Sequence, residues 1–128
     1  MKMGFRIALI IWTILMLTLS SLPDFKAPDV LPKFADKVVH LTEYCIWAIL
    51  FLLMLKQEDR INTLLNAFVA VLIFGAILGI FDEVHQRFIS GRSMDKYDLL
   101  ADVIGIILAI ILFRIFYRRP KYYIPERK

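Results

Sequence analysis

The stretch INTLLNAFVAVLIFGAILGIF, residues 61–81, has no Asp, Glu, Lys or Arg at any of its 21 positions. A helix needs about 20 apolar residues to cross the hydrocarbon region of a bilayer, so this stretch alone is long enough to span a membrane. Three further uncharged stretches, residues 7–22, 44–55 and 103–113, alternate with short polar segments. The sequence therefore predicts an all-α integral membrane protein.

The overall composition fits this prediction once the positions of the charges are considered. Charged residues make up 22% of the 128 residues, a fraction close to that of a soluble protein, whereas 59% of the residues are hydrophobic. This segregation of charge from apolar stretches excludes a soluble globular domain, a disordered chain and a soluble coiled coil. The basic excess of the chain, a net charge of +4, lies beside the apolar stretches. We therefore expect membrane lipids as partners and no nucleic acid.

Helix breakers and polar flanks give the limits of the expected spans. One domain covers residues 1–128, with spans at about residues 5–22, 35–55, 61–90 and 95–117. The third span is longer than a bilayer is thick at 1.5 Å per residue, so its last part is expected to extend into the interface as helix until Gly91, a residue suited to a left-handed stop. The first span is expected to be retained, because Thr18-Leu19-Ser20 makes a poor signal-peptide cleavage site.

The distribution of Lys and Arg predicts the orientation of these spans. Ten of them lie at the N-terminus, in the short segment after the second span and in the C-terminal tail, and six lie in the other two loops. The positive-inside rule then places both termini of this multi-pass chain in the cytoplasm.

Small residues at four-residue spacing predict how the spans pack. Gly75-x3-Gly79 lies in the third span and Ala101-x3-Gly105-x3-Ala109 in the fourth. Such spacing lets helix backbones approach closely in lipid, which favours a compact four-helix transmembrane bundle. The single cysteine, Cys45, lies within an apolar stretch, and we interpret it as a small packing residue.

Polar residues gather near one end of three of the spans. They are Asp36, His40 and Glu43 in the second span, Asp82, Glu83 and Gln86 at the end of the third, and Asp98 and Asp102 in the fourth. Those of the second span follow one another at i, i+4 and i+7, so that they share one helix face. In an antiparallel bundle with short loops, all of these ends meet at one outward-facing membrane depth. Ionisable groups there are costly and usually paired or functional.

Two stretches of the chain resemble the signatures of a known family. DKVVHLTEY (residues 36–44) and EVHQRFISGRSMDKYDLLADVIG (residues 83–105) are similar to those of the VanZ-like family of small bacterial membrane proteins, and the resemblance covers essentially the whole chain. Two positions depart from the family pattern: Ser90 stands where proline is usual, and Asp102 where asparagine is usual. The resemblance implies a multi-pass protein of the bacterial inner membrane that is associated with the cell envelope. For the founding member it also implies reduced susceptibility to the lipoglycopeptide antibiotic teicoplanin. It implies no established reaction.

The first functional hypothesis is an enzyme or lipid-binding protein that acts on a lipid-linked head group or cell-wall precursor. A histidine beside carboxylates supplies a general base or acid, and Arg92 can bind a phosphate through two N–H donors. The candidate catalytic residues are His40, Glu43, Glu83, Gln86 and Asp98, and the candidate binding residues are Asp36, Tyr44, Arg92, Asp95 and Asp102. The sequence carries no nucleophile motif, so the existence of a reaction, like any cofactor, stays open.

A metal site is the second option. His40 and Glu43 lie three residues apart on one helix, and a carboxylate from the third or fourth span would complete a ligand set. The spacing is not H-E-x-x-H, and the several histidines usual in such sites are lacking, so the sequence assigns no metal ligand.

The remaining alternatives involve no chemistry at the polar residues. In one, the protein is a non-catalytic interaction or scaffold protein whose polar cluster only holds the bundle together, with Asp95 as the N-cap of the fourth helix. Transport is a weaker option, because four spans leave no room for an alternating-access pathway without oligomerisation.

Overall fold

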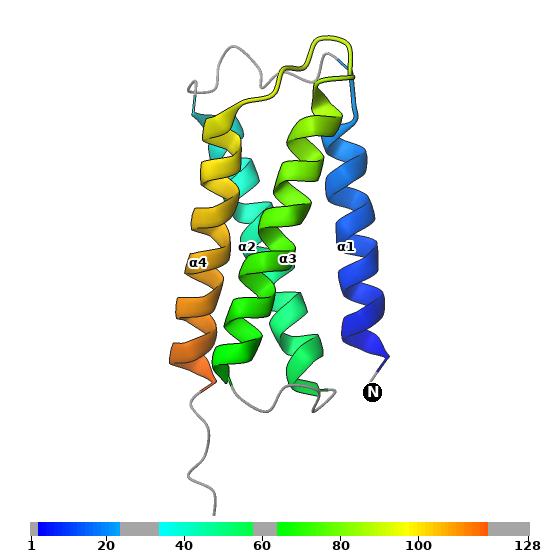
Figure 1. Cartoon of the computed structure of the whole chain (residues 1–128). Coiled ribbons are helices and arrows are strands. Elements are labelled where there is room, and N and C mark those ends of the chain that lie inside the picture. Colours follow the sequence, from blue (N-terminus) through cyan, green and yellow to red (C-terminus); the bar gives the residue numbers. More distant parts are fainter. Residues whose placement is uncertain (1–2, 24–33, 58–63, 118–128) are drawn as a thin grey trace, which may run out of the picture.

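A computed structural model of the chain describes residues 3–23, 34–57 and 64–117. These residues form four α-helices and no strand: α1 (Gly4–Ser20), α2 (Ala35–Gln57), α3 (Leu64–Gln86) and α4 (Lys96–Phe116). The helices run alternately up and down in an antiparallel bundle (Figure 1). The predicted all-α four-helix fold is therefore confirmed.

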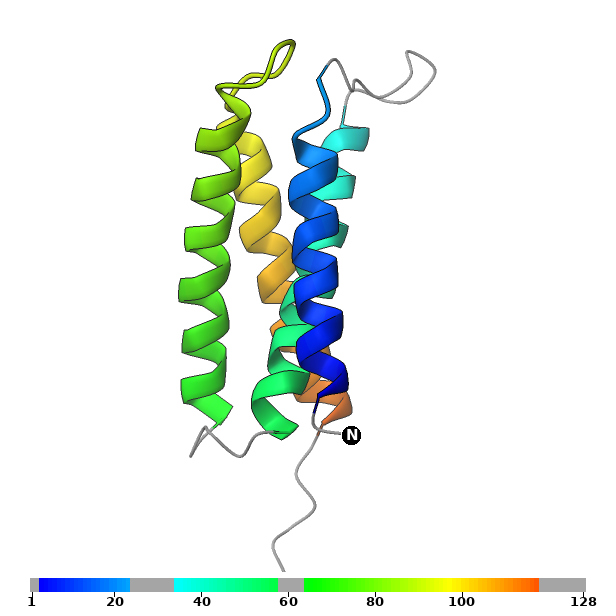
Figure 2. The same ribbon diagram turned by 90° about the vertical axis from the view of Figure 1, so that its right-hand side faces the viewer.

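The helices differ in how much of one another they cover. The most extensive contact joins α2 and α4, which are not consecutive in the chain. Helix α3 packs mainly on α4, and α1 packs mainly on α2 with little contact to α3 (Figure 2). Helix α2 therefore contacts each of the other three helices, with α4 and α1 on different sides of it.

Three of the helices, α2, α3 and α4, are long and apolar enough to cross a membrane. Helix α1 is apolar but has 17 residues, which at 1.5 Å per residue reach about 25 Å, somewhat less than the hydrocarbon thickness of a bilayer. Large apolar side chains are exposed along the outside of the bundle, among them Ile10, Ile73, Phe74, Ile77 and Ile111. An apolar exterior of this extent is that of a membrane protein.

The small residues lie where helix backbones come together, as their spacing predicts. A Cβ atom added to Gly105 of α4 would collide with the backbone carbonyl oxygen of Leu41 and lie 3.1 Å from the backbone nitrogen of Cys45, both in α2. A Cβ atom on Gly75 of α3 would instead meet the end of the Ile106 side chain. The backbones of α2 and α4 therefore approach each other as closely as a glycine permits.

The third helix is shorter than expected. It ends at Gln86 instead of continuing to residue 90, because the amides of Phe88 and Ile89 donate to carbonyls only three residues back, as in turns. The backbone amide of Asp95 donates to Glu83 Oε2 at 2.7 Å, and this contact requires the chain to reverse soon after α3. Gly91 has a φ of 77°, the left-handed conformation expected of it.

Some predictions fall on segments outside the described residues. These are the proline-rich loop at 24–33, the charged segment at 58–63, which includes the expected start of the third span, and the basic tail after residue 117.

Candidate functional site

One end of the bundle is polar inside. The last turn of α1, the first turns of α2 and α4 and the last turns of α3 meet there, at the end opposite to the start of α1 (Figure 1). We call this the polar end. Six polar or charged residues are buried in it: His40, Asp82, Glu83, Gln86, Asp98 and Asp102. The structure thus brings together residues from three helices that the sequence placed at one depth.

His40 of α2 is fixed by Asp102 of α4. The His40 Nδ1 atom lies 3.0 Å from Asp102 Oδ1, and Asp102 is 1% exposed. A carboxylate only accepts hydrogen bonds, so Nδ1 carries the proton, and in the neutral ring the lone pair lies on Nε2. An asparagine carbonyl at position 102 would accept the same hydrogen bond. The departure from the family pattern at this position therefore keeps the orientation of the histidine and adds a negative charge.

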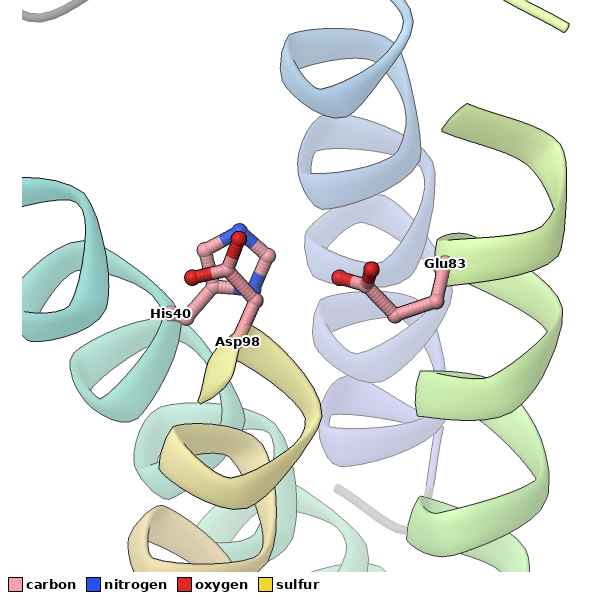
Figure 3. Close-up of side chains that lie close together, drawn as sticks. All are labelled: His40, Glu83 and Asp98. Atoms are coloured by element: carbon pink, nitrogen blue, oxygen red, sulfur yellow. The ribbon is translucent and has the colours of Figure 1, made fainter. Parts of the chain in front are cut away.

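Three possible ligand groups converge beside this pair. One ligand atom each from His40, Glu83 and Asp98 lies within 4.8 Å of the other two, and all three residues are buried. Figure 3 shows the Glu83 carboxylate reaching from α3 toward His40 and Asp98 on the facing helices. Glu83 is fully buried, and its Oε1 atom has no hydrogen-bond partner among the described residues.

Lys37 links three carboxylates at the rim of this cluster. Its Nζ atom lies 2.6 Å from Asp98 Oδ1, 2.7 Å from Asp95 Oδ2 and 2.9 Å from Asp36 Oδ2. Asp95 also accepts a hydrogen bond from the Tyr97 amide at 2.8 Å, which confirms it as the N-cap of α4. The hydrogen bonds from Lys37 and Tyr97 hold the pKa of Asp95 below its ordinary value of 3.8. The sequence showed Lys37 as part of the family signature but gave it no role.

A second network joins α1 to α3. The Ser20 hydroxyl donates to Asp82 Oδ1 at 2.5 Å, and the Gln86 side-chain amide donates to Ser20 Oγ at 2.9 Å and to Asp82 Oδ2 at 3.2 Å. Next to it, the Ser21 hydroxyl lies 3.1 Å from His85 Nε2. The sequence prediction missed Ser20. The sequence feature that could have indicated this role is the pair Ser20 and Ser21, two hydroxyl residues near the end of the first apolar stretch and at the same depth as Gln86.

Several predicted site residues lie at the margin of the cluster. Arg92 donates to the carbonyl oxygens of Leu19 and Leu22 at 3.4 Å, so it sits against the C-terminal end of α1. Asp36 contacts Lys37 and is half-buried. Glu43 is half-buried, does not belong to the converging triad, and accepts a hydrogen bond from Trp12 through its backbone carbonyl.

Tyr44 lies one turn deeper than His40. It is 1% exposed, and its hydroxyl has no hydrogen-bond partner within residues 3–23, 34–57 and 64–117. A Cβ atom on Gly79 would lie 3.6 Å from this hydroxyl and 3.0 Å from Asp102 Oδ2. The hydroxyl and the second oxygen of Asp102 therefore face the same glycine of α3.

Comparisons with known proteins cover nearly the whole chain. The family model described as VanZ/LLP1 matches residues 5–117. "Uncharacterized protein C11E3.10" of Schizosaccharomyces pombe is 27% identical to this chain over 106 residues, which are 83% of this chain and 62% of that protein. The chain thus spans about three fifths of the length of that relative. No solved structure matches the chain.

Proposed function

The chain belongs to the VanZ/LLP1 family, and we propose that it is a membrane protein of the cell envelope whose polar end binds the head group of a lipid-linked envelope component. If the protein is an enzyme, its polar end also modifies this head group. The observation that carries this proposal is the buried triad of His40, Glu83 and Asp98 at one end of a bundle whose exterior is apolar. Ionisable groups at membrane depth cost several kcal/mol and mark functional sites by default. A purely structural cluster would gain more from apolar packing.

The chemistry of the polar end suits such a head group. The carboxylates of Glu83 and Asp98 accept hydrogen bonds from hydroxyl and amide groups, which abound in sugars and peptides. Arg92 supplies positive charge at the rim for a phosphate. His40, held by Asp102, can accept or donate a proton through Nε2. In this proposal the polar end faces the outside of a bacterial inner membrane, where envelope precursors are used.

The proposal is tested by binding and by antibiotic susceptibility. The full chain in lipid nanodiscs would be titrated with undecaprenyl phosphate and with undecaprenol, which lacks the phosphate, and bound lipid would be read by native mass spectrometry. We expect the phosphorylated lipid to bind and His40→Ala or Glu83→Gln to abolish binding, whereas Thr42→Val, on the exposed face of α2, leaves it unchanged. By family resemblance, expression of the wild-type chain should also lower teicoplanin susceptibility of a bacterial host, and the two site variants should not. Equal binding of both lipids would refute the proposal.

A specific observation also favours a second function, that of a non-catalytic interaction or scaffold protein. Ser20, Asp82 and Gln86 join α1 to α3, and Arg92 joins the loop before α4 to the end of α1. If the protein is such a scaffold, the polar residues serve to hold the helix ends together. Site variants would then lose thermal stability in detergent in parallel with any loss of function, and a stable but inactive variant would exclude it.

A further inference from the structure

We propose that His40, Glu83 and Asp98 bind a divalent first-row transition-metal ion, for which zinc is the probe. The three residues come from three helices, and their ligand atoms already lie within 4.8 Å of one another (Figure 3). A bound ion needs each donor about 2 Å away, so donors up to about 4 Å apart surround it. The separations in the triad exceed that value by less than about 1 Å.

The environment of Glu83 points to a missing ligand. Its Oε2 atom accepts a hydrogen bond from the Asp95 amide, whereas Oε1 is buried and has no partner among the described residues. A buried carboxylate oxygen without a partner is unfavourable by several kcal/mol. The carboxylate points toward His40 and Asp98 (Figure 3), where a cation would satisfy it.

The environment of His40 has the arrangement of a metal-ligating histidine. Such histidines donate the N–H of one ring nitrogen to a carboxylate or carbonyl and offer the other nitrogen to the metal. Here Nδ1 donates to Asp102 at 3.0 Å, and Nε2 is left as the ligand atom. Asp102 is thus a positioning residue, which acts on the metal through His40.

The charge balance of the polar end also favours a dication. Lys37 is shared by three carboxylates, Asp36, Asp95 and Asp98. Glu83 and Asp102 are buried beside them without a contact to Lys37 in the described structure. A divalent ion would offset the negative charge that one lysine does not.

The donor set selects the kind of metal. One imidazole with two carboxylates suits zinc, manganese or iron better than calcium or magnesium, which bind through oxygen alone. Three protein ligands leave at least one coordination position for water or for an oxygen of another molecule. This inference does not rest on the proposed head-group function, since the metal site is complete without a lipid. If both hold, the open position is where a phosphate oxygen would bind.

The test measures zinc binding by the purified full chain. Protein in detergent, with any affinity tag removed because polyhistidine binds zinc, would be stripped with EDTA and titrated with Zn²⁺ by calorimetry. Elemental analysis after dialysis would give the stoichiometry. We expect one equivalent per chain and a higher melting temperature with zinc than with EDTA, and no such rise with Mg²⁺ or Ca²⁺.

Matched variants identify the ligands. His40→Gln, Glu83→Gln and Asp98→Asn should each weaken zinc binding by more than about 100-fold, and Asp102→Asn, which keeps an acceptor for Nδ1, by about tenfold. The control is His85→Gln, which removes an imidazole at the polar end but lies outside the triad. It should keep one equivalent with affinity within about threefold. Glu43→Gln tests the alternative ligand set in which Glu43 would bind the ion together with His40. Melting in EDTA would confirm that each variant is folded.

Each outcome decides the proposal. A wild-type chain that takes up less than about 0.2 equivalents refutes it, and so does zinc binding that survives in all three triad variants. Loss of binding in Glu43→Gln or His85→Gln, with Glu83→Gln unaffected, would place the ion elsewhere and overturn the assignment. If Glu83→Gln does not fold, His40→Gln and Asp98→Asn carry the same comparison. Lipid binding is not measured in this experiment, so its failure leaves the head-group proposal to its own test.

Discussion

Replacing Gly105 by alanine should destabilise the bundle more than any other glycine-to-alanine change within the described helices. The three atoms nearest to the added methyl group would all be backbone atoms of α2, in Leu41 and Cys45, which cannot move aside as the end of a flexible side chain can. The helices α2 and α4 would have to separate by on the order of 1 Å along their most extensive contact.

The size of the effect follows from two opposing contributions. Overpacking in a well-packed interior costs about 1–3 kcal/mol, and the upper value applies here because the atoms nearest to the methyl group are backbone atoms. Alanine recovers about 1 kcal/mol through its higher helix propensity. The net loss of unfolding free energy is thus about 2 kcal/mol, and at about 4 °C per kcal/mol for a chain of this size the melting temperature should fall by about 8 °C.

Two other glycines provide the controls. Gly75→Ala would meet the terminal carbon of Ile106 at 2.5 Å, a side-chain atom that can rotate away, so its effect should be smaller. Gly4→Ala has nothing within 4 Å and should change the melting temperature by less than about 2 °C. The three variants would be compared by thermal unfolding in one detergent, monitored by circular dichroism. The reasoning fails if Gly105→Ala is as stable as the wild type, or if Gly75→Ala loses as much.

Three further predictions concern the polar end. Ser20→Ala removes the hydroxyl that joins two buried polar groups of α3, so it should lower the unfolding free energy by about 1–2 kcal/mol in the same melting assay; no change would mean that the network contributes nothing. Because the pKa of Asp95 is lowered in the folded state, its charge stabilises the protein above the unfolded-state pKa, and this stabilisation is lost as the pH falls through the folded-state pKa. The melting-temperature difference between the wild type and Asp95→Asn should therefore be constant above about pH 5 and shrink below about pH 4, and a difference that grows on acidification would contradict it. For orientation, Ser93→Cys in a Cys45→Ala background should react with a membrane-impermeant thiol reagent from outside intact cells, whereas protection there would reverse the predicted topology.

The fold was predictable because a bilayer imposes simple constraints on sequence. The uncharged stretch at 61–81 is long enough to span, and the spacing around Gly105 identified the face of α4 that meets another helix. The end of α3 was not predictable in this way. No proline directly follows Gln86 to stop the helix, and the chain beyond it returns to place the Asp95 amide on Glu83, a contact that only the folded chain provides.

The candidate site was predictable in its depth but not in its pairings. Helical spacing placed Asp36, His40 and Glu43 on one stripe, yet residues three apart point about 60° away from each other around a helix. The His40 side chain contacts Asp102 of α4 and belongs to the converging triad, whereas Glu43 does not. Rotation of each helix about its axis is determined by packing, which a single sequence does not display.

Packing and polar chemistry are coupled at the contact between α2 and α4. Leu41, whose carbonyl oxygen faces Gly105, directly follows His40, and Gly105 lies three residues after Asp102 on α4. The distance at which the two backbones meet therefore also sets the 3.0 Å hydrogen bond between His40 and Asp102. A bulkier residue at position 105 would move His40 away from Asp102, and the imidazole would no longer be held in one orientation. The glycine in the family signature is thus explained by the site that it brings together as well as by the packing of the helices.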